Sequence, residues 1–283
     1  MKKLSVVLAV RNEEKNIGRC LDSIKDIADE IVVVDEYSTD KTVEIAKEHG
    51  AKVFLEPHHN IFHITKQGAL EKATGEWILQ LDADEVVTPE LAKEIELVIR
   101  NQKLVVNGKK ELFERHQKLI EQRDGPIGKM TGEVAGYFIP RRNVFLGKPL
   151  IHAGVYPDGV IRLVKKGKAH FPQKSVHEQI QLDGEVAWLS GDILHYDSPT
   201  FERYLSRLNR YTDLQREEFK QKKLPKNISV LLFYSFVKPK LVFLNLYILH
   251  KGFLDGMRGF VWSLFSSFHF PIAYFKYWQD NNK

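Results

Sequence analysis

The chain has 283 residues, of which 43% are hydrophobic and 28% are charged, and its formal net charge is +5 at pH 7. This composition is typical of a folded globular protein and excludes a disordered chain, and so small a positive excess gives no reason to expect a nucleic-acid partner. The single cysteine, Cys20, excludes an internal disulfide. The length allows one α/β core together with a smaller second element.

The first hundred residues predict strands that alternate with helices. Four short runs rich in Val, Ile and Leu are typical of buried strands, and helix-like segments separate them. The strands are predicted at 4–10, 30–35, 51–54 and 77–81, and the helices at 16–27, 38–49 and 62–73. The first apolar run is too short for a signal peptide. The alternation predicts right-handed crossovers and a mainly parallel sheet, whose ligand site lies beyond the carboxyl ends of the strands.

Acidic side chains follow two of these strands. Asp35 ends the second strand, and Asp82 and Asp84 follow the strand at 77–81. Residues i and i+2 of a strand point the same way, so Asp82 and Asp84 are expected to address one ligand. Their oxygens suit Mg²⁺ or Mn²⁺, which complete their coordination with water and phosphate oxygens. The pair therefore predicts chemistry on a nucleotide-diphosphate donor.

The remainder of the chain changes character twice. A charged, helix-favouring stretch at 89–122 precedes short strands and turns at 133–195 and a helix at 200–222. Three apolar blocks then follow, each shorter than the roughly 18 to 20 residues that a spanning helix needs. They are found at 228–237, 241–249 and 260–275. Flanking lysines and interspersed Tyr and Trp residues favour helices that lie in the membrane interface. The alternative is packing on the catalytic domain or on another subunit.

Several motifs in order resemble a known family. They are Ala9-Val10-Arg11-Asn12-Glu13-Glu14, Val33 to Asp40, Gly75 to Glu85, Ile139 to Asn143, Gly154 to Asp158, Ser175 to Glu178, His195-Tyr196 and Asn209 to Thr212. This set resembles the family 2 glycosyltransferases with a Rossmann-like GT-A fold, and the later motifs look like the branch that includes lipopolysaccharide core β-1,4-glucosyltransferases. The resemblance implies an α/β GT-A domain at 1–224, with a nucleotide-sugar half at 1–100 and an acceptor and catalytic half at 131–224. Residues 225–283 then form an amphipathic, membrane-associating helical region.

The resemblance also implies an activity, an inverting transfer from a UDP-sugar, possibly UDP-glucose, to a hydroxyl of a lipid-linked or lipopolysaccharide-core glycan at the inner, cytoplasmic face of the cell membrane. Asp84, helped by Asp82, would hold Mg²⁺ or Mn²⁺, and Glu178 would be the base that accepts the acceptor proton. Further donor-side residues would be Asp35 and Lys66. Because arginine binds phosphate in bidentate fashion, Arg162, Arg207 and above all Arg210 are candidates to contact the diphosphate or an anionic acceptor. The acceptor side would include Tyr156, Asp158, His177 and His195.

Simpler interpretations stay open at this point. Asp35 is also typical of a turn, Lys66 of a solvated helix face, and the neighbours His177 and Glu178 of a structural polar pair. The chain carries Tyr37 where relatives usually have a small residue, often glycine. A dehydrogenase is disfavoured because no G-x-G-x-x-G turn follows the first strand. A catalytically degenerate, membrane-bound carbohydrate-binding or scaffold protein is the alternative function.

Overall fold

The computed structural model describes residues 3–102, 109–172 and 180–280. The chain divides into two compact units, the first made of Met1–Arg142 and Pro157–His195 and the second of Asn143–Tyr156 and Tyr196–Lys283. Strands β6 (Val134–Phe145) and β12 (Ile193–Ser198) begin in the first unit and end in the second. The chain therefore passes between the units along continuous strands.

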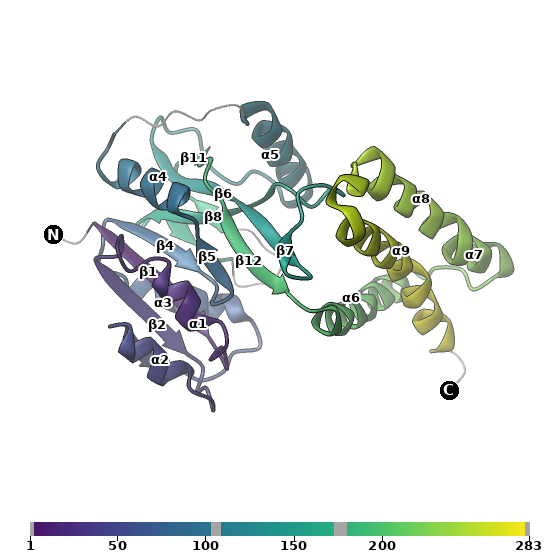
Figure 1. The fold of residues 1–283 in the computed structure, drawn as a ribbon, viewed down its shortest axis with the longest axis horizontal. Helices are drawn as coiled ribbons and strands as arrows, with labels where there is room; N and C mark the ends of the chain where they lie inside the picture. The colour runs from purple at the N-terminus through teal and green to yellow at the C-terminus, as the bar shows by residue number, and fades with distance from the viewer. Residues whose placement is uncertain (1–2, 103–108, 173–179, 281–283) are drawn as a thin grey trace. The chain divides into compact units, whose positions relative to one another are not determined.

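The predicted strands and helices of the first hundred residues are present (Figure 1). The four predicted strands are β1 (Leu4–Val10), β2 (Glu30–Asp35), β3 (Lys52–Leu55) and β4 (Trp77–Leu81), and the three predicted helices are α1 (Ile17–Asp22), α2 (Thr42–Glu48) and α3 (Phe62–Lys72). A short strand that was not predicted, β5 (Glu85–Val87), and helix α4 (Pro89–Ile99) follow. Helix α4 begins as its sequence predicts, because the Thr88 side chain caps the backbone N–H of Leu91 and a proline occupies the first turn. Next come α5 (Lys110–Asp124), β8 (Asp158–Lys165), β9 (Ala169–His170), β10 (Gln181–Leu182) and β11 (Glu185–Trp188).

The main sheet is mixed. Among the described residues its strand order is β3-β2-β1-β4-β8-β6-β12-β5, and β11 also pairs with β6. Strands β3, β2, β1 and β4 are parallel, as the alternating pattern predicts. The expectation of a mainly parallel sheet is wrong for most of the remainder, where β8 pairs antiparallel with both β4 and β6, and β12 pairs antiparallel with β5, although β11 is parallel to β6. Because no helix connects β6 to β8 as a crossover, these strands run in opposite directions.

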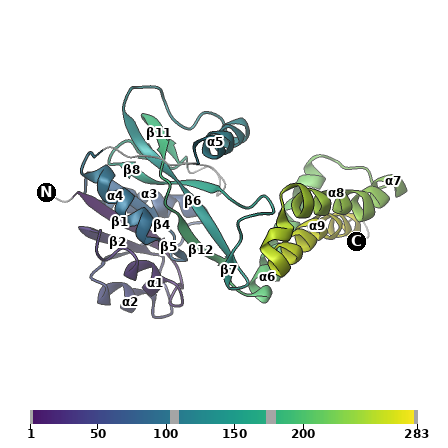
Figure 2. The ribbon, with the colours of Figure 1, turned by 45° about the horizontal axis from the view of Figure 1, so that its top comes forward.

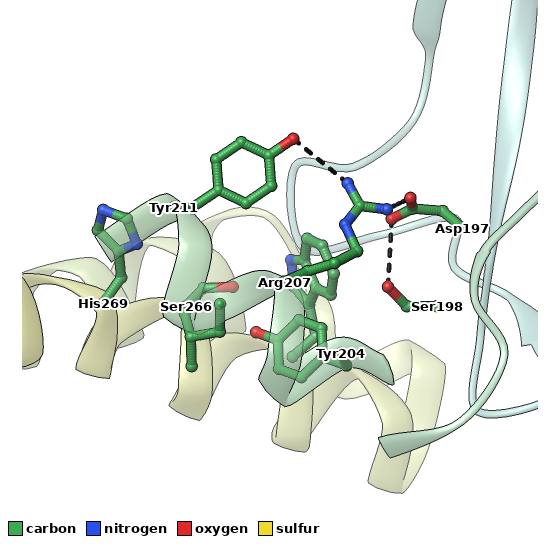
Figure 3. Close-up of a pocket in the computed structure, with 9 residues that line it drawn as sticks. Asp197, Ser198, Tyr204, Arg207, Tyr211, Ser266 and His269 are labelled. Carbon is green, nitrogen blue, oxygen red and sulfur yellow. Dashed lines mark hydrogen bonds and ion pairs between the residues drawn. The ribbon is translucent and has the colours of Figure 1, made fainter. Parts of the chain in front are cut away.

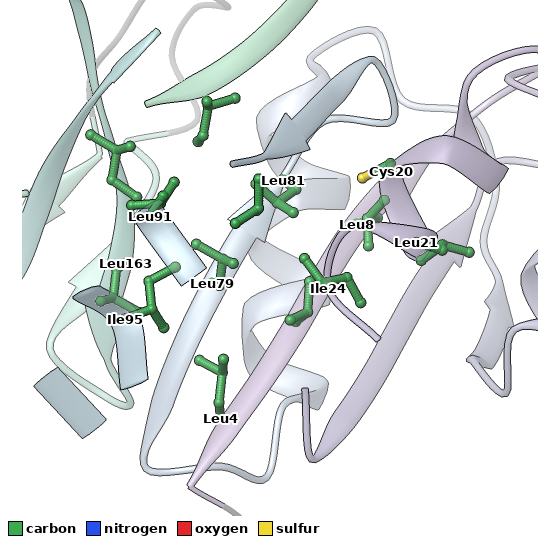
Figure 4. Close-up of a cluster of buried hydrophobic side chains, with 14 of the residues drawn as sticks. Leu4, Leu8, Cys20, Leu21, Ile24, Leu79, Leu81, Leu91, Ile95 and Leu163 are labelled. Carbon is green, nitrogen blue, oxygen red and sulfur yellow. The ribbon is translucent and has the colours of Figure 1, made fainter. Parts of the chain in front are cut away.

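Both faces of the sheet are covered by helices. Side chains of β1 alternate between the faces, so that Leu4, Val6 and Leu8 pack with residues of α1 and α4, whereas Val7 packs with residues of α3 and α5. Figure 4 shows the first of these cores, in which the buried Cys20 is an ordinary packed side chain. The two cores hold the carboxyl ends of β2 and β4 in a rigid frame.

The second unit is mostly helical. Its elements are the short β7 (Lys148–Pro149), which pairs with β6, then α6 (Phe201–Gln221), α7 (Ile228–Leu232), the π-helical η1 (Phe233–Val237), α8 (Lys238–Leu244), the π-helical η2 (Asn245–Leu249), the 3₁₀ turn η3 (Gly252–Asp255) and α9 (Gly256–Gln279). Within this unit, α9 lies alongside α6 and α8 in both Figure 1 and Figure 2. Phe219 of α6 is buried against Tyr274 and Tyr277 of α9. Helix α6 thus belongs to the same packed unit as the C-terminal helices.

The first two apolar blocks form one helical segment, Ile228–Leu249, of 22 residues. The sequence places Pro239 between the blocks, but the backbone stays helical at Val237 and Lys238. Proline lacks an N–H and crowds the preceding turn, and the π-helical turn just before α8 relieves that crowding. The separate short blocks expected from the sequence are therefore joined, and by length and composition alone the segment is able to span a membrane.

Candidate active site

Asp35 lies at the carboxyl end of β2 and is fully buried. Its carboxylate accepts a hydrogen bond from the backbone N–H of Ser38 at 2.7 Å and another from the Ser38 hydroxyl. Between Asp35 and Ser38, Tyr37 adopts φ +52°, the left-handed conformation that glycine occupies without strain, and its side chain is exposed. The backbone thus accounts for the small residue that relatives carry there, and Asp35 stabilises the turn.

Asp82 lies directly beyond β4 between two cations. Its Oδ1 is 2.6 Å from the Lys66 amine, and its Oδ2 is 2.5 Å from the Arg162 guanidinium. Lys66 is only 8% exposed, so the alternative interpretation, in which it belongs to a solvated helix face, is wrong. Helix α3 turns this residue inward because Ala69 packs in the core on the sheet and the buried Thr65 hydroxyl donates a hydrogen bond to Glu36. Asp82 is consequently a fully paired carboxylate.

Arg162 of β8 organises the polar groups around β4. Its guanidinium donates to the side chains of Gln80, Asp82 and Glu85, the last at 2.6 Å. Glu85 is completely buried and also accepts a hydrogen bond from the Asp82 backbone N–H at 3.0 Å. Sequence reasoning did not assign Gln80 or Glu85 to the site. The available signals were a polar residue inside an apolar strand and a third carboxylate next to the acidic pair.

Asp84 and His195 form the second pair of the site. His195 lies on β12, opposite Glu85 of β5 in the sheet, and its Nε2 is 3.7 Å from Oδ1 of Asp84. Both side chains are mostly buried. A carboxylate oxygen and an imidazole nitrogen are both ligand types for divalent metal ions, so Asp84 fits the predicted metal role, and His195, expected on the acceptor side, is a second possible ligand.

Burial and neighbouring charges shape the electrostatics of the site. Burial opposes ionisation of Asp82, but Arg162 and Lys66 outweigh it and hold the pKa of this carboxyl well below its ordinary value. Burial lowers the pKa of Lys66, although Asp82 opposes the shift. Burial, reinforced by Arg141, lowers the pKa of His195 to about 4. At neutral pH the imidazole is therefore uncharged and has a nitrogen lone pair for a metal.

The remaining predicted residues are spread over both units. Asp158 belongs to the first unit and pairs with Arg141 at 2.7 Å. Tyr156 and Arg210 belong to the second unit, where Arg210 lies 5.5 Å from the ring centre of Tyr211. His177 and the predicted base Glu178 lie outside the described residues.

The sequence model of Glycosyl transferase family 2 matches residues 5–154, and this match covers more than half of the chain. The chain belongs to this family. An uncharacterized glycosyltransferase of Rickettsia typhi is 29% identical over 278 residues, covering 95% of this chain and 84% of the relative. The lipopolysaccharide core biosynthesis glycosyltransferase LpsC of Rhizobium meliloti is 25% identical over 280 residues, covering 93% of this chain and 90% of the relative.

The solved structures similar to this family 2 enzyme include S. aureus TarS 1–349 in complex with UDP-GlcNAc. That match has 16% identity and a TM-score of 0.44, and it covers 95% of this chain and 82% of TarS. Glucosyl-3-phosphoglycerate synthase from Mycobacterium tuberculosis, in complex with Mn²⁺ and UDP-glucose, matches 30% of this chain and 34% of its own, with 29% identity and a TM-score of 0.28. Because both scores are low, membership rests on the sequence match. The predicted α/β GT-A fold and the predicted glycosyltransferase activity are both confirmed.

Proposed function

We propose that this glycosyltransferase moves a sugar, possibly glucose, from a UDP-sugar to a hydroxyl of a lipid-linked or lipopolysaccharide-core glycan, with inversion at the anomeric carbon. The observation that carries the proposal is the arrangement beyond β4, where Asp84 lies 3.7 Å from His195 and Asp82 lies between Lys66 and Arg162. It combines two side chains that would ligate a metal with two cations at the carboxyl end of a strand. The relative named for lipopolysaccharide core biosynthesis supports the acceptor class.

In this proposal Asp84 and His195 would hold Mg²⁺ or Mn²⁺. The bound ion would offset the negative charge that develops on the leaving diphosphate. Lys66 would donate a hydrogen bond to a diphosphate oxygen, while Arg162 keeps Asp82 and Glu85 in place. Asp35 would hold the turn beside the nucleobase, and Arg210 would add a positive charge on the donor side. Each of these groups is positioned before substrate binds, which lowers the reorganisation cost of the reaction.

The acceptor oxygen would attack the anomeric carbon while the bond from that carbon to the diphosphate breaks. Glu178 would accept the hydroxyl proton, and UDP would leave. Tyr156, Asp158 and His177 would line the acceptor side. Of these, Asp158 is held by Arg141 in the described structure.

We further propose that the second unit attaches the enzyme to the inner face of the cell membrane. Large apolar side chains stay exposed along Ile228–Leu249 and α9, including Phe236 at 69%, Leu249 at 74% and Met257 at 75%. Exposed apolar surface on this scale is typical of an interaction with lipid or protein. Lysines at positions 222 and 223 precede the segment, and those at 238 and 240 lie between its two apolar blocks; all four would attract anionic headgroups.

The test of the enzymatic proposal is UDP release from a panel of UDP-sugars by the full chain, with and without EDTA. We expect release from one donor, its loss with EDTA and its recovery with added Mn²⁺ or Mg²⁺. Asp84→Asn should reduce release by at least about 100-fold, because it weakens the only strongly anionic member of the proposed metal pair. Asp26→Asn, on the exposed surface after α1, is the matched control and should leave release unchanged.

Three results would overturn parts of this proposal. Release that is insensitive to EDTA and to Asp84→Asn would remove the metal role. If the Glu178→Gln variant still releases UDP and still transfers sugar to a membrane lipid extract, Glu178 is not the base. An anomeric configuration retained in the product, read by NMR, would contradict inversion.

A further inference from the structure

A cavity of about 250 Å³ opens in the second unit between α6 and α9 (Figure 3). We propose that it binds one pyranose ring of the acceptor glycan; this inference rests on the proposed function. The lining residues all belong to the second unit. They are Asp197, Ser198, Tyr204, Arg207, Leu208, Tyr211, Trp262, Ser266 and His269.

Aromatic rings make the walls of the cavity. Tyr204 and Trp262 lie with ring centres 5.6 Å apart, and Phe145 packs edge-on against both from behind. Tyr211 contributes a third ring, which is 37% exposed. Aromatic side chains have few rotatable bonds and offer a flat apolar surface, which suits the C–H face of a sugar ring. The pocket is therefore largely formed before a ligand binds.

Polar groups cluster on one side of the same cavity. Arg207 forms an ion pair with Asp197 and donates a hydrogen bond to the Tyr211 hydroxyl at 3.3 Å. The Ser198 hydroxyl donates to Asp197 at 3.2 Å. Figure 3 shows these groups side by side along the pocket. A guanidinium next to a carboxylate offers donors and acceptors together, which matches the neighbouring hydroxyls of a pyranose.

The charge of the pocket argues against an anionic ligand. Arg207 was a candidate for phosphate on sequence grounds, but its charge is offset by Asp197. Burial lowers the pKa of His269, so this side chain adds no positive charge at neutral pH. The pocket consequently has hydrogen-bonding capacity with little net charge.

Its polarity and size also argue against a lipid tail. An acyl chain would cover Asp197, Arg207 and Ser198 without replacing their hydrogen bonds to water, which is costly. A different groove of the same unit suits acyl chains better, because apolar side chains of α7, η1 and α9 line it and Ser235 is its one polar residue among those described. The cavity volume lies below the roughly 300 to 1,000 Å³ of sites for drug-sized ligands, so a single ring fits better than an extended chain.

The experiment is saturation-transfer NMR on the full chain in detergent, with methyl glycosides of hexoses and heptoses at millimolar concentration and with inorganic pyrophosphate as a second probe. We expect saturation of the ring protons of at least one glycoside. Tyr211→Leu should weaken this binding about tenfold, because the sugar loses its stacking surface. Tyr211→Phe keeps the ring and should retain most of the binding. Leu214→Ala, at an exposed position of the same helix, is the control.

UDP release without glycan, measured on the same proteins, separates this inference from the proposed function. If release fails while glycoside binding depends on the Tyr211 ring, the pocket stands and the donor assignment falls. If release occurs but glycosides bind Tyr211→Leu as well as the unchanged chain, or bind neither protein, the pocket inference is overturned. Ring-dependent binding of pyrophosphate alone would overturn it as well, in favour of an anion site.

Discussion

Replacing Arg162 by methionine should lower the stability of the first unit by about 3 to 5 kcal/mol, the range found when one partner of a buried ion pair is removed. The side chain of Arg162 is 7% exposed, and the change removes its hydrogen bonds to Gln80, Asp82 and Glu85. Methionine has similar length, so the main loss is charge and hydrogen bonding and not volume. Buried carboxylates would be left without their principal counter-ion.

The structure shows how far the remaining contacts compensate. Asp82 keeps Lys66 at 2.6 Å and is 27% exposed, so water partly replaces the lost partner. Glu85 is 0% exposed and keeps only a longer contact to Arg141, at 3.4 Å, among its described cations. Most of the cost should therefore arise at Glu85. In the Glu85→Gln background, Arg162→Met should cost at least about 1 to 2 kcal/mol less, a coupling that a double-mutant cycle measures.

Hydrogen exchange of the β1 and β4 amides, read by mass spectrometry, reports the opening free energy of this unit separately from the C-terminal helices. Arg100→Met is the matched control, since Arg100 is exposed and pairs with Glu96 one helical turn away at 3.4 Å. That change should cost at most about 0.5 kcal/mol. If Arg162→Met lowers the opening free energy by no more than the control does, the buried network does not stabilise the fold as argued.

Three further predictions concern other parts of the chain. Burial lowers the pKa of His116, so the unfolded state binds more protons than the folded state, and the stability of the protein should fall as the pH drops below 6.5. The His116→Gln variant should show a weaker pH dependence of stability in urea titrations at several pH values. Gly259→Ala should lower the stability by more than about 2 kcal/mol, because the new Cβ would lie 1.8 Å from the Gly252 carbonyl oxygen. As a control, Gly18→Ala should be neutral or slightly stabilising, because its nearest such contact is at 3.5 Å. Thermal melts distinguish the two variants. Phe236→Asp should reduce flotation with anionic phospholipid vesicles several-fold; unchanged flotation of the folded variant would contradict membrane attachment through this face.

Much of the first half of the fold follows from local patterns. Strands β1, β2 and β4 are parallel and buried on both faces, which produces near-continuous apolar runs that identify them without tertiary information. The same rule places Asp35, Asp82 and Asp84 at the carboxyl ends of strands. Tyr37 stands out because it occupies a position with positive φ, where glycine is the usual residue. In each case the physical cause acts within a few residues of the chain.

The second half of the fold is harder to predict, because its physical causes act between residues that are far apart in the chain. The directions of strands β6, β8 and β12 depend on which neighbours they pair with, and not on their own composition. The joining of two apolar blocks across Pro239 depends on a local π-helical turn, which the sequence pattern does not indicate.

The sequence by itself determined the family, the four parallel strands, the acidic residues at their ends and the apolar character of the C-terminal region. Only the tertiary structure decided which groups meet: Lys66 and Arg162 with Asp82, His195 with Asp84, and α6 with α9 around the aromatic pocket. Periodicity reports which face of an element is apolar, because that depends on spacing within the element. It does not report the partner of a buried charge 80 residues away, because that partner is selected by the pairing of whole strands.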